Sequence, residues 1–265
     1  MNQRWRERRA RYRPDGEFLD PKRYSVEPIE RDTAKRFVLA HQYSGSFPAT
    51  RLSVGLFRSR GDIFGPDLVG VAVFSVPMSQ AVLPKWLGTD PMSGVELGRF
   101  VLLDDVEGNG ETWFLARAFR ALRREIPDVR GVLSFSDPVP SFNAETGAIV
   151  MPGHFGMIYQ AFNGRYMGRA NPTTLVLDRR GRVVSHRSLV KIRLQERGWE
   201  RDAADFVARG APPRAIGEDP AEWVRRARTS FRRVRHHGNH AYGWDFGGAV
   251  LRPEKPRPSK IDLFR

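Results

Sequence analysis

The apolar segment GVLSFS contains two serines and is followed by an aspartate, and these three side chains could hold a proton or a ligand. Ser134 and Ser136 alternate along GVLSFS, so a strand over these residues places both hydroxyls on one face. Asp137 follows at the C-terminal end of that strand, where ligands often bind in α/β sheets. The alternative for Asp137 is a structural one, capping of the turn at Pro138.

A glutamate and an arginine lie three residues apart in the apolar run VELGRFVLL. In a regular strand, Glu96 and Arg99 face opposite sides of the sheet. A bulge at Gly98 would turn both toward one site, and glycine inside a strand often marks such a bulge. An ion pair across neighbouring strands is an equally good interpretation.

The loop HQYSG carries three further polar side chains. His41, Tyr43 and Ser44 precede Gly45, a composition suited to a turn that faces a ligand. The structural alternative is that His41 stabilises the C-terminus of the helix before the loop.

The segment DDVEGNGETWFLARAF joins an apolar run to a helical pattern. Gly108, Asn109, Gly110, Glu111 and Thr112 would place backbone N–H groups and a helix N-terminus where a pyrophosphate could bind. The motif is only GxG, however. A turn in which Asn109 or Thr112 caps the helix is about as well supported.

Charge and composition restrict the chemistry and the partner. The 265 residues contain no cysteine, so thiolate nucleophiles and disulfides are excluded and any metal must use nitrogen and oxygen ligands. The net charge of +14 favours a polyanionic partner, above all nucleic acid. A genome that encodes Arg in place of Lys explains why the chain has 38 Arg and only 6 Lys. It does not explain why the acidic residues are too few to balance the basic ones.

The basic residues gather toward both ends of the chain. Six arginines lie between residues 4 and 13, and six more between residues 225 and 235. The predicted DNA contacts are Arg117, Arg120, Arg165, Arg232, Arg233, Arg235, His236 and Asn239. We expect no membrane contact, because WRERRARYR offers no sustained apolar face.

The apolar spacing indicates which elements position these groups. We expect strands over YSVEPIE, LSVGLFRS, DLVGVAVFSV, VELGRFVLL and GVLSFS, the second and third as an antiparallel pair. Helices are expected over AKRFVLA, where Asp32 or Thr33 would be the cap, and from Glu111 onward. A short helix is expected in GHFGMIYQAF. The run TTLVLDRRGRVVSHRS predicts a hairpin, and DAADFVARGA and PAEWVRRARTSFRRVRHH predict helices.

Five segments together resemble the Mom family of phage DNA-modification proteins. They are HQYSG, ELGRFVLLDDVEGNGETWFLARAF, SFSDP, GHFGMIYQAFNGRYMGR and HHGNHAYGW, and the resemblance spans roughly residues 30 to 245. It implies an α/β fold similar to the GCN5-related N-acetyltransferases (GNAT), with a mixed sheet flanked by helices. It also implies an enzyme that converts adenine in duplex DNA to N6-carbamoylmethyladenine and so shields phage DNA from restriction.

The resemblance implies further site residues. Tyr159 lies on the short helix where the acetyltransferase fold often places its general acid, although Phe155, Ile158 and Phe162 show that this helix also packs in the core. Val101 joins the residues expected to bind the donor, a phosphate-bearing small molecule of unknown identity, such as an acyl-CoA-like one. A simple acetyl thioester does not suffice, because the product carries a CH₂ carbon on N6.

A metal is a minor hypothesis. Iron has been suggested for the family, and His154, His236, His237 and His240 are the histidines that could bind it. Their spacing fits no standard site, so contacts of HHGNH with phosphates or bases are the stronger interpretation.

These observations predict three segments: a basic arm at 1–23, an acyltransferase-like core at 24–195 and a helical, basic extension at 196–265. The charged N-terminus lacks the apolar region of a signal peptide, so we expect the host-cell cytoplasm. Two other functions remain open: a conventional acyl-CoA-dependent N-acetyltransferase acting on a small amine or protein, and a non-enzymatic DNA-binding protein.

Overall fold

The fold was analysed in a computed structural model, which describes residues 3–6, 9–12, 16–42, 45–61, 65–151 and 153–258. The chain forms two compact units. The first comprises residues 1–138, 154–169 and 239–265, and the second comprises residues 139–153 and 170–238. The predicted boundaries at residues 23 and 195 therefore do not coincide with this division, because the chain returns from the second unit to the first after residue 238.

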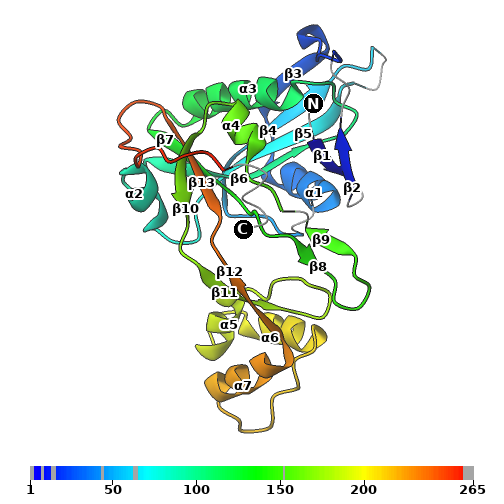
Figure 1. Cartoon of the computed structure of the whole chain (residues 1–265), viewed down its shortest axis with the longest axis vertical. Coiled ribbons are helices and arrows are strands. Elements are labelled where there is room, and N and C mark those ends of the chain that lie inside the picture. Colours follow the sequence, from blue (N-terminus) through cyan, green and yellow to red (C-terminus); the bar gives the residue numbers. More distant parts are fainter. Residues whose placement is uncertain are drawn as a thin grey trace. The chain divides into compact units, whose positions relative to one another are not determined.

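A seven-stranded mixed sheet forms the first unit (Figure 1). Its strands, in spatial order, are β10 (Arg165–Arg169), β13 (His240–Asp245), β7 (Gly131–Ser136), β6 (Gly94–Leu102), β5 (Asp67–Ser75), β4 (Thr50–Arg58) and β3 (Tyr24–Pro28). All neighbours are antiparallel except β6 and β7, which are parallel. A separate antiparallel pair joins β1 (Gln3–Arg6) and β2 (Arg9–Tyr12).

Helices cover both faces of this sheet. They are α1 (Arg31–His41), α2 (Val82–Leu87), α3 (Gly110–Glu125) and α4 (Met157–Ala161). Val54, Leu56 and Phe74 pack with α3, whereas Val71 and Val73 pack with α1. Because side chains alternate along a strand, α1 and α3 lie on opposite faces. The predicted α/β fold, a mixed sheet flanked by helices, is confirmed.

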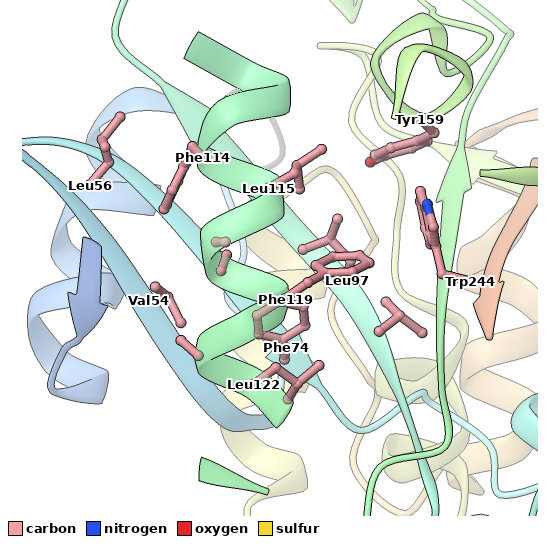
Figure 2. Close-up of a cluster of buried hydrophobic side chains, with 14 of the residues drawn as sticks. Val54, Leu56, Phe74, Leu97, Phe114, Leu115, Phe119, Leu122, Tyr159 and Trp244 are labelled. Atoms are coloured by element: carbon pink, nitrogen blue, oxygen red, sulfur yellow. The ribbon is translucent and has the colours of Figure 1, made fainter. Parts of the chain in front are cut away.

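The longest helix follows the predicted apolar spacing. Phe114, Leu115, Ala118, Phe119 and Leu122 recur at intervals of three and four residues, and all are buried. Phe119 reaches from α3 into the centre of the aromatic cluster (Figure 2), where its ring centroid lies 5.1 Å from that of Phe162 and 5.3 Å from that of Trp244. The core is therefore closed by aromatic residues from α3, α4 and β13 that are distant in sequence.

The second unit has its own core. Its elements are β8 (Ser141–Phe142), β9 (Ile149–Met151), β11 (Thr173–Leu177), α5 (His186–Arg193), α6 (Trp199–Ala208), α7 (Pro220–Ala227) and β12 (Arg232–His236). Phe206, Trp223 and Phe231 form the centre of its buried cluster. The β8 and β9 strands pair with each other, and so do β11 and β12.

Three predictions about local structure are wrong. RRVRHH is a strand, because residues 232–236 pair with residues 173–177 and this pairing overrides the helical pattern. The expected hairpin at residues 173–188 is limited to the bridge between Leu177 and Val183 and its turn. The cap of α1 is Glu30, one residue before the helix, and not Asp32 or Thr33.

Replacing Phe119 by alanine should destabilise the first unit by about 3–5 kcal/mol, because a large buried side chain is lost and the rigid aromatic cluster cannot fill the cavity. Thermal unfolding followed by circular dichroism measures the change. Arg120→Ala, at the exposed neighbouring position, is the control and should change stability by less than about 0.5 kcal/mol. Equal melting temperatures for the parent and Phe119→Ala would contradict the assigned core.

Candidate functional site

Two parallel strands of the first unit separate soon after they pair. β6 and β7 are in register only from Gly94 opposite Gly131 to Glu96 opposite Leu133. Beyond that point β6 continues along β5, and β7 continues along β13. The Ser134 hydroxyl donates a hydrogen bond to the Leu97 carbonyl (3.0 Å) where the strands diverge. Side chains from both faces of the sheet can approach each other here, because no strand pairing separates them.

A bulge lies where the sequence suggested one. Val73 pairs with Arg99 and Phe74 pairs with Leu97, so Gly98 has no counterpart on β5. Leu97 packs with α3, whereas Val101 packs with α1. Leu97 and Val101 are four positions apart, so in a regular strand they would lie on the same face of the sheet. They lie on opposite faces, which shows that the alternation of side chains is interrupted between them. Glu96 and Arg99 consequently share the α1 face.

Arg99 is anchored to the loop that follows α1. It donates from Nε to the Ser46 carbonyl (3.1 Å) and from Nη2 to the Ser46 hydroxyl (2.7 Å). A third bond runs from Nη1 to the Gly98 carbonyl (2.6 Å). Burial raises the pKa of Glu96, and the positive charge of Arg99 opposes that shift. Glu96 and Arg99 therefore interact electrostatically.

Tyr159 is placed by α4 beside this point. Its ring packs against Tyr242 and Trp244, with centroids 5.5 and 5.8 Å away, and Figure 2 shows it next to Trp244. Burial raises the pKa of its phenol, whereas a hydrogen bond with Ser134 lowers it; the charges of Glu96 and Arg99 also act on it. The phenol stays protonated at neutral pH and can donate a proton. Tyr159 is thus a core residue that also presents a polar group.

Ser134 and Ser136 share the face that carries Tyr159. Ser134 pairs with Tyr242, and Ser136 pairs with His240. Ser136 is fully buried, and its hydroxyl has no hydrogen-bond partner within the described part of the chain. An unsatisfied buried hydroxyl costs free energy, so it is a natural contact for a bound ligand.

His154 lies near Tyr159, and the sequence suggested it only as a metal ligand. Its backbone N–H donates to the Asp137 carbonyl (2.6 Å), and its ring centroid lies 6.5 Å from that of Tyr159. Burial lowers the pKa of His154, and the negative charge of Asp137 partly offsets this. The imidazole is therefore neutral at pH 7 and can accept a proton.

The remaining predicted catalytic residues precede β4. His41 is the last residue of α1 and is exposed, with its ring 4.6 Å from that of Phe37. This position matches the structural alternative, a histidine at a helix C-terminus. Tyr43 and Ser44 lie outside the described residues.

The glycine loop differs from the expected phosphate cradle in two ways. The Gly108 amide donates to the Glu17 carbonyl (2.6 Å), and the Gly110 amide donates to the Glu107 carbonyl (3.3 Å). These two donors are thus engaged within the protein. Positive φ occurs at Asn109 (62°) and not at Gly110.

Of the two predicted caps of α3, Asn109 occupies the N-cap position and Thr112 does not. The Asn109 side chain makes no capping bond, and the Thr112 hydroxyl donates back to the Asn109 carbonyl (3.3 Å). Glu111 is buried in the first turn. Val101 packs its side chain in the core against α1, and its backbone pairs with Val71 of β5.

Arginines on α3 line a hollow of about 250 Å³ in the first unit. Arg117, Arg120 and Arg124 share it with Tyr24 and Trp113. The Arg117 guanidinium lies 3.4 Å from the centroid of the Trp113 ring. Burial and the positive charge of Arg120 lower the pKa of Arg117. Like charges held this close favour a bound anion, so the prediction of DNA contacts at Arg117 and Arg120 has a structural basis.

The other predicted DNA contacts differ in exposure. Arg165, Arg232, Arg233 and Arg235 are exposed, and Asn239 is half-buried. His236 is only 5% exposed, and its Nδ1 accepts a hydrogen bond from the Gly238 amide (3.0 Å). Because the ring is held inside the turn, His236 does not face a macromolecular partner in this conformation.

The described residues contain no group of three or more His, Asp or Glu side chains that could hold a metal ion. His240 accepts or donates at Nδ1 with the Tyr166 hydroxyl (2.8 Å), and His236 is occupied by Gly238. The iron hypothesis therefore has no ligand set in this part of the chain. Among the same residues, no helix is both long and apolar enough to cross a membrane.

The sheet order and the diverging parallel strands define a mixed α/β fold. The chain belongs to the Mom protein family, whose profile matches residues 23–211. The methylcarbamoylase Mom of Escherichia phage Mu is 29% identical over 159 residues, which are 59% of this chain and 58% of that protein. The chain therefore matches somewhat more than half the length of this relative.

The solved structures include a distant neighbour. A tandem GNAT protein from the clavulanic acid biosynthesis pathway, solved without acetyl-CoA, is 13% identical with a TM-score of 0.35. The alignment covers 91% of this chain and 82% of the other. A likeness this weak says nothing about chemistry.

A side chain at Gly98 should disturb the bulge. A Cβ atom there would lie 2.4 Å from the Ser75 hydroxyl oxygen, which is buried and bonds to the Glu96 carbonyl (3.3 Å). We expect Gly98→Ala to lower the free energy of unfolding by about 1–3 kcal/mol, as overpacking does. Chemical denaturation measures the change.

Ser75→Ala removes the clashing oxygen and supplies the control. In the double variant, Gly98→Ala should cost clearly less than it does alone, with a coupling of about 0.5 kcal/mol or more. Strict additivity of the two substitutions would contradict the proposed clash at the bulge.

Proposed function

We propose that this protein is a DNA-modifying transferase that converts adenine in duplex DNA to N6-carbamoylmethyladenine. Membership of the Mom family over residues 23–211 carries the proposal, together with a relative named a methylcarbamoylase. The modification would protect phage DNA from restriction in the host cytoplasm. The basic character of the chain supports DNA as the substrate.

The chemistry requires two proton movements. A bond forms between adenine N6 and the CH₂ carbon of the donor, and the bond from that carbon to its leaving group breaks. N6 loses a proton in the process, and the leaving group can gain one. His154 is neutral and suited to accept the first proton, whereas Tyr159 is protonated and suited to supply the second.

The diverging strands support a single reaction centre. Glu96 and Arg99 approach from the α1 face, and Ser134 and Tyr159 from the opposite face. The charges of Glu96 and Arg99 act on the Tyr159 phenol, which places these groups in one electrostatic environment. The unsatisfied Ser136 hydroxyl adds a contact for the base or for the donor.

The target adenine must leave the duplex before it can react. N6 is paired and stacked in DNA, and flipping the base costs a few kcal/mol. Contacts between arginine and phosphate, together with aromatic packing around the base, can offset this cost. For the phosphate contacts we propose the arginines predicted from the sequence to bind DNA, which lie on α3, β10 and β12. The donor would be a small phosphate-bearing molecule, and the amides of the glycine loop that remain available would hold it.

Plasmid DNA from cells that express the protein tests this proposal. We expect mass spectrometry of its nucleosides to detect adenine heavier by one carbamoylmethyl group. Tyr159→Phe keeps the packing of the ring but removes the hydroxyl, and it should reduce modification about 10²-fold or more, with an unchanged melting temperature. Tyr166→Phe is the matched control, because it removes a buried hydroxyl that bonds to His240, and it should retain modification.

The alternatives give different outcomes in the same assay. Unmodified adenine from cells with abundant soluble protein would favour the non-enzymatic DNA-binding protein. An acetylated amine or protein in place of modified DNA would favour the conventional N-acetyltransferase. Parental modification by Tyr159→Phe would remove the phenol from the mechanism.

A further inference from the structure

A large hollow on the surface of the second unit is lined by arginines. Its volume is about 610 Å³, and Arg193, Arg225, Arg228 and Arg233 contribute to its wall. They come from α5, α7, the 3-10 turn at Arg228–Ser230 and β12. Four cationic side chains from four elements thus converge on one depression.

Carboxylates of this unit pair mainly with arginines elsewhere on it. Arg182 pairs with Asp178 and Arg226 with Glu218, at 2.9 and 2.8 Å. Within the hollow, the one carboxylate is Glu222, which pairs with Arg225 (3.2 Å). Its other arginines, at positions 193, 228 and 233, form no ion pair with the residues that the structure describes. The hollow therefore carries an excess of positive charge.

A packed scaffold holds these arginines in place. On α7 and at its C-terminal end, each of two arginines of the hollow directly follows a buried residue. Arg225 follows Val224, and Arg228 follows Ala227. Phe231, just before β12, stacks on Phe206 with ring centroids 5.0 Å apart. The backbone that carries the arginines is thus fixed by the core of the unit, which reduces the entropy lost on binding.

The line of charge continues along β12. Arg233 and Arg235 are two residues apart in a strand, so they point to the same face, and both are exposed. Like charges gathered in this way repel one another unless an anion lies between them. Guanidinium groups match phosphate oxygens through paired N–H donors, and a row of them suits a chain of phosphates better than a single one.

We infer that this arginine hollow binds the phosphodiester backbone of duplex DNA. The inference rests on the proposed function, and it adds Arg193, Arg225 and Arg228 to the DNA contacts expected on β12. Binding by the second unit would hold the duplex while the site of the first unit acts on one base.

Salt dependence of DNA binding tests the inference. In the full-length protein, the triple variant Arg193→Gln, Arg228→Gln, Arg233→Gln removes three charges from the hollow. Its matched control is Arg179→Gln, Arg197→Gln, Arg201→Gln, which removes three exposed charges of the same unit outside the hollow. Fluorescence anisotropy with a labelled duplex measures affinity over a range of salt concentrations, and melting temperatures confirm folding.

The hollow variant should reduce the log–log salt slope by about 0.9 for each phosphate that it no longer neutralises, hence by up to about 2.7, and the control should keep the parental slope. Equal slopes for the two variants would overturn the inference. Loss of coenzyme A binding in the hollow variant, measured by calorimetry with an unchanged DNA slope, would also overturn it and assign the hollow to a small phosphate ligand.

The proposed function can fail independently. Nucleoside mass spectrometry decides whether the parent protein modifies adenine, whereas the slope decides whether the hollow contacts DNA. A parent that binds DNA through the hollow but leaves adenine unmodified would retain the hollow as a DNA site and remove the transferase activity.

Discussion

The interrupted pairing between β6 and β7 is the constraint on which the candidate site depends. Three residue pairs hold the two parallel strands together, and then each strand follows a different antiparallel neighbour. In a continuous sheet, Glu96 and Tyr159 would be separated by backbone. The divergence lets groups from both faces act on one another, and the bulge at Gly98 adds Arg99 to the same side as Glu96. Aromatic packing of Phe119, Trp244 and Tyr159 then fixes α4 against the sheet.

The protonation states follow from burial more than from ion pairing. Burial is the largest influence on the pKa of Glu96, His154 and Tyr159 alike, and it favours the neutral form of each. A neutral imidazole next to a protonated phenol is a pair that can pass protons in opposite directions at neutral pH. Most of the arginines proposed to bind DNA are by contrast exposed, and Arg117 is half-buried. The candidate reaction centre thus contains groups whose pKa values are shifted by burial, whereas the proposed DNA-binding surface is mostly solvated and cationic.

Much of the first unit was predictable because its signals are local. The helical spacing of Leu115, Phe119 and Leu122 and the alternation in GVLSFS were sufficient for α3 and β7, whereas Gly98 suggested the bulge only as one of two equal alternatives. The return of residues 240–245 to the sheet, between β10 and β7, was not predictable, because it depends on pairing with a strand more than a hundred residues earlier. β12 was not predictable for the same reason. Its sequence suggested a helix, but in the structure it pairs with the distant segment Thr173–Leu177. The lowered pKa of His154 was not predictable, because it comes from burial, which the sequence neighbours of His154 do not reveal.

The most direct test of the account is where a target base lies in the complex. A duplex that carries 8-azidoadenine can be irradiated with the full-length protein, and the adduct located by peptide mass spectrometry. The account predicts adducts on peptides from β6, from β7 or from residues 153–162, next to Glu96, Ser136, His154 and Tyr159. Adducts confined to other parts of the chain, in protein that binds the duplex normally, would contradict the assignment of the reaction centre to the diverging strands.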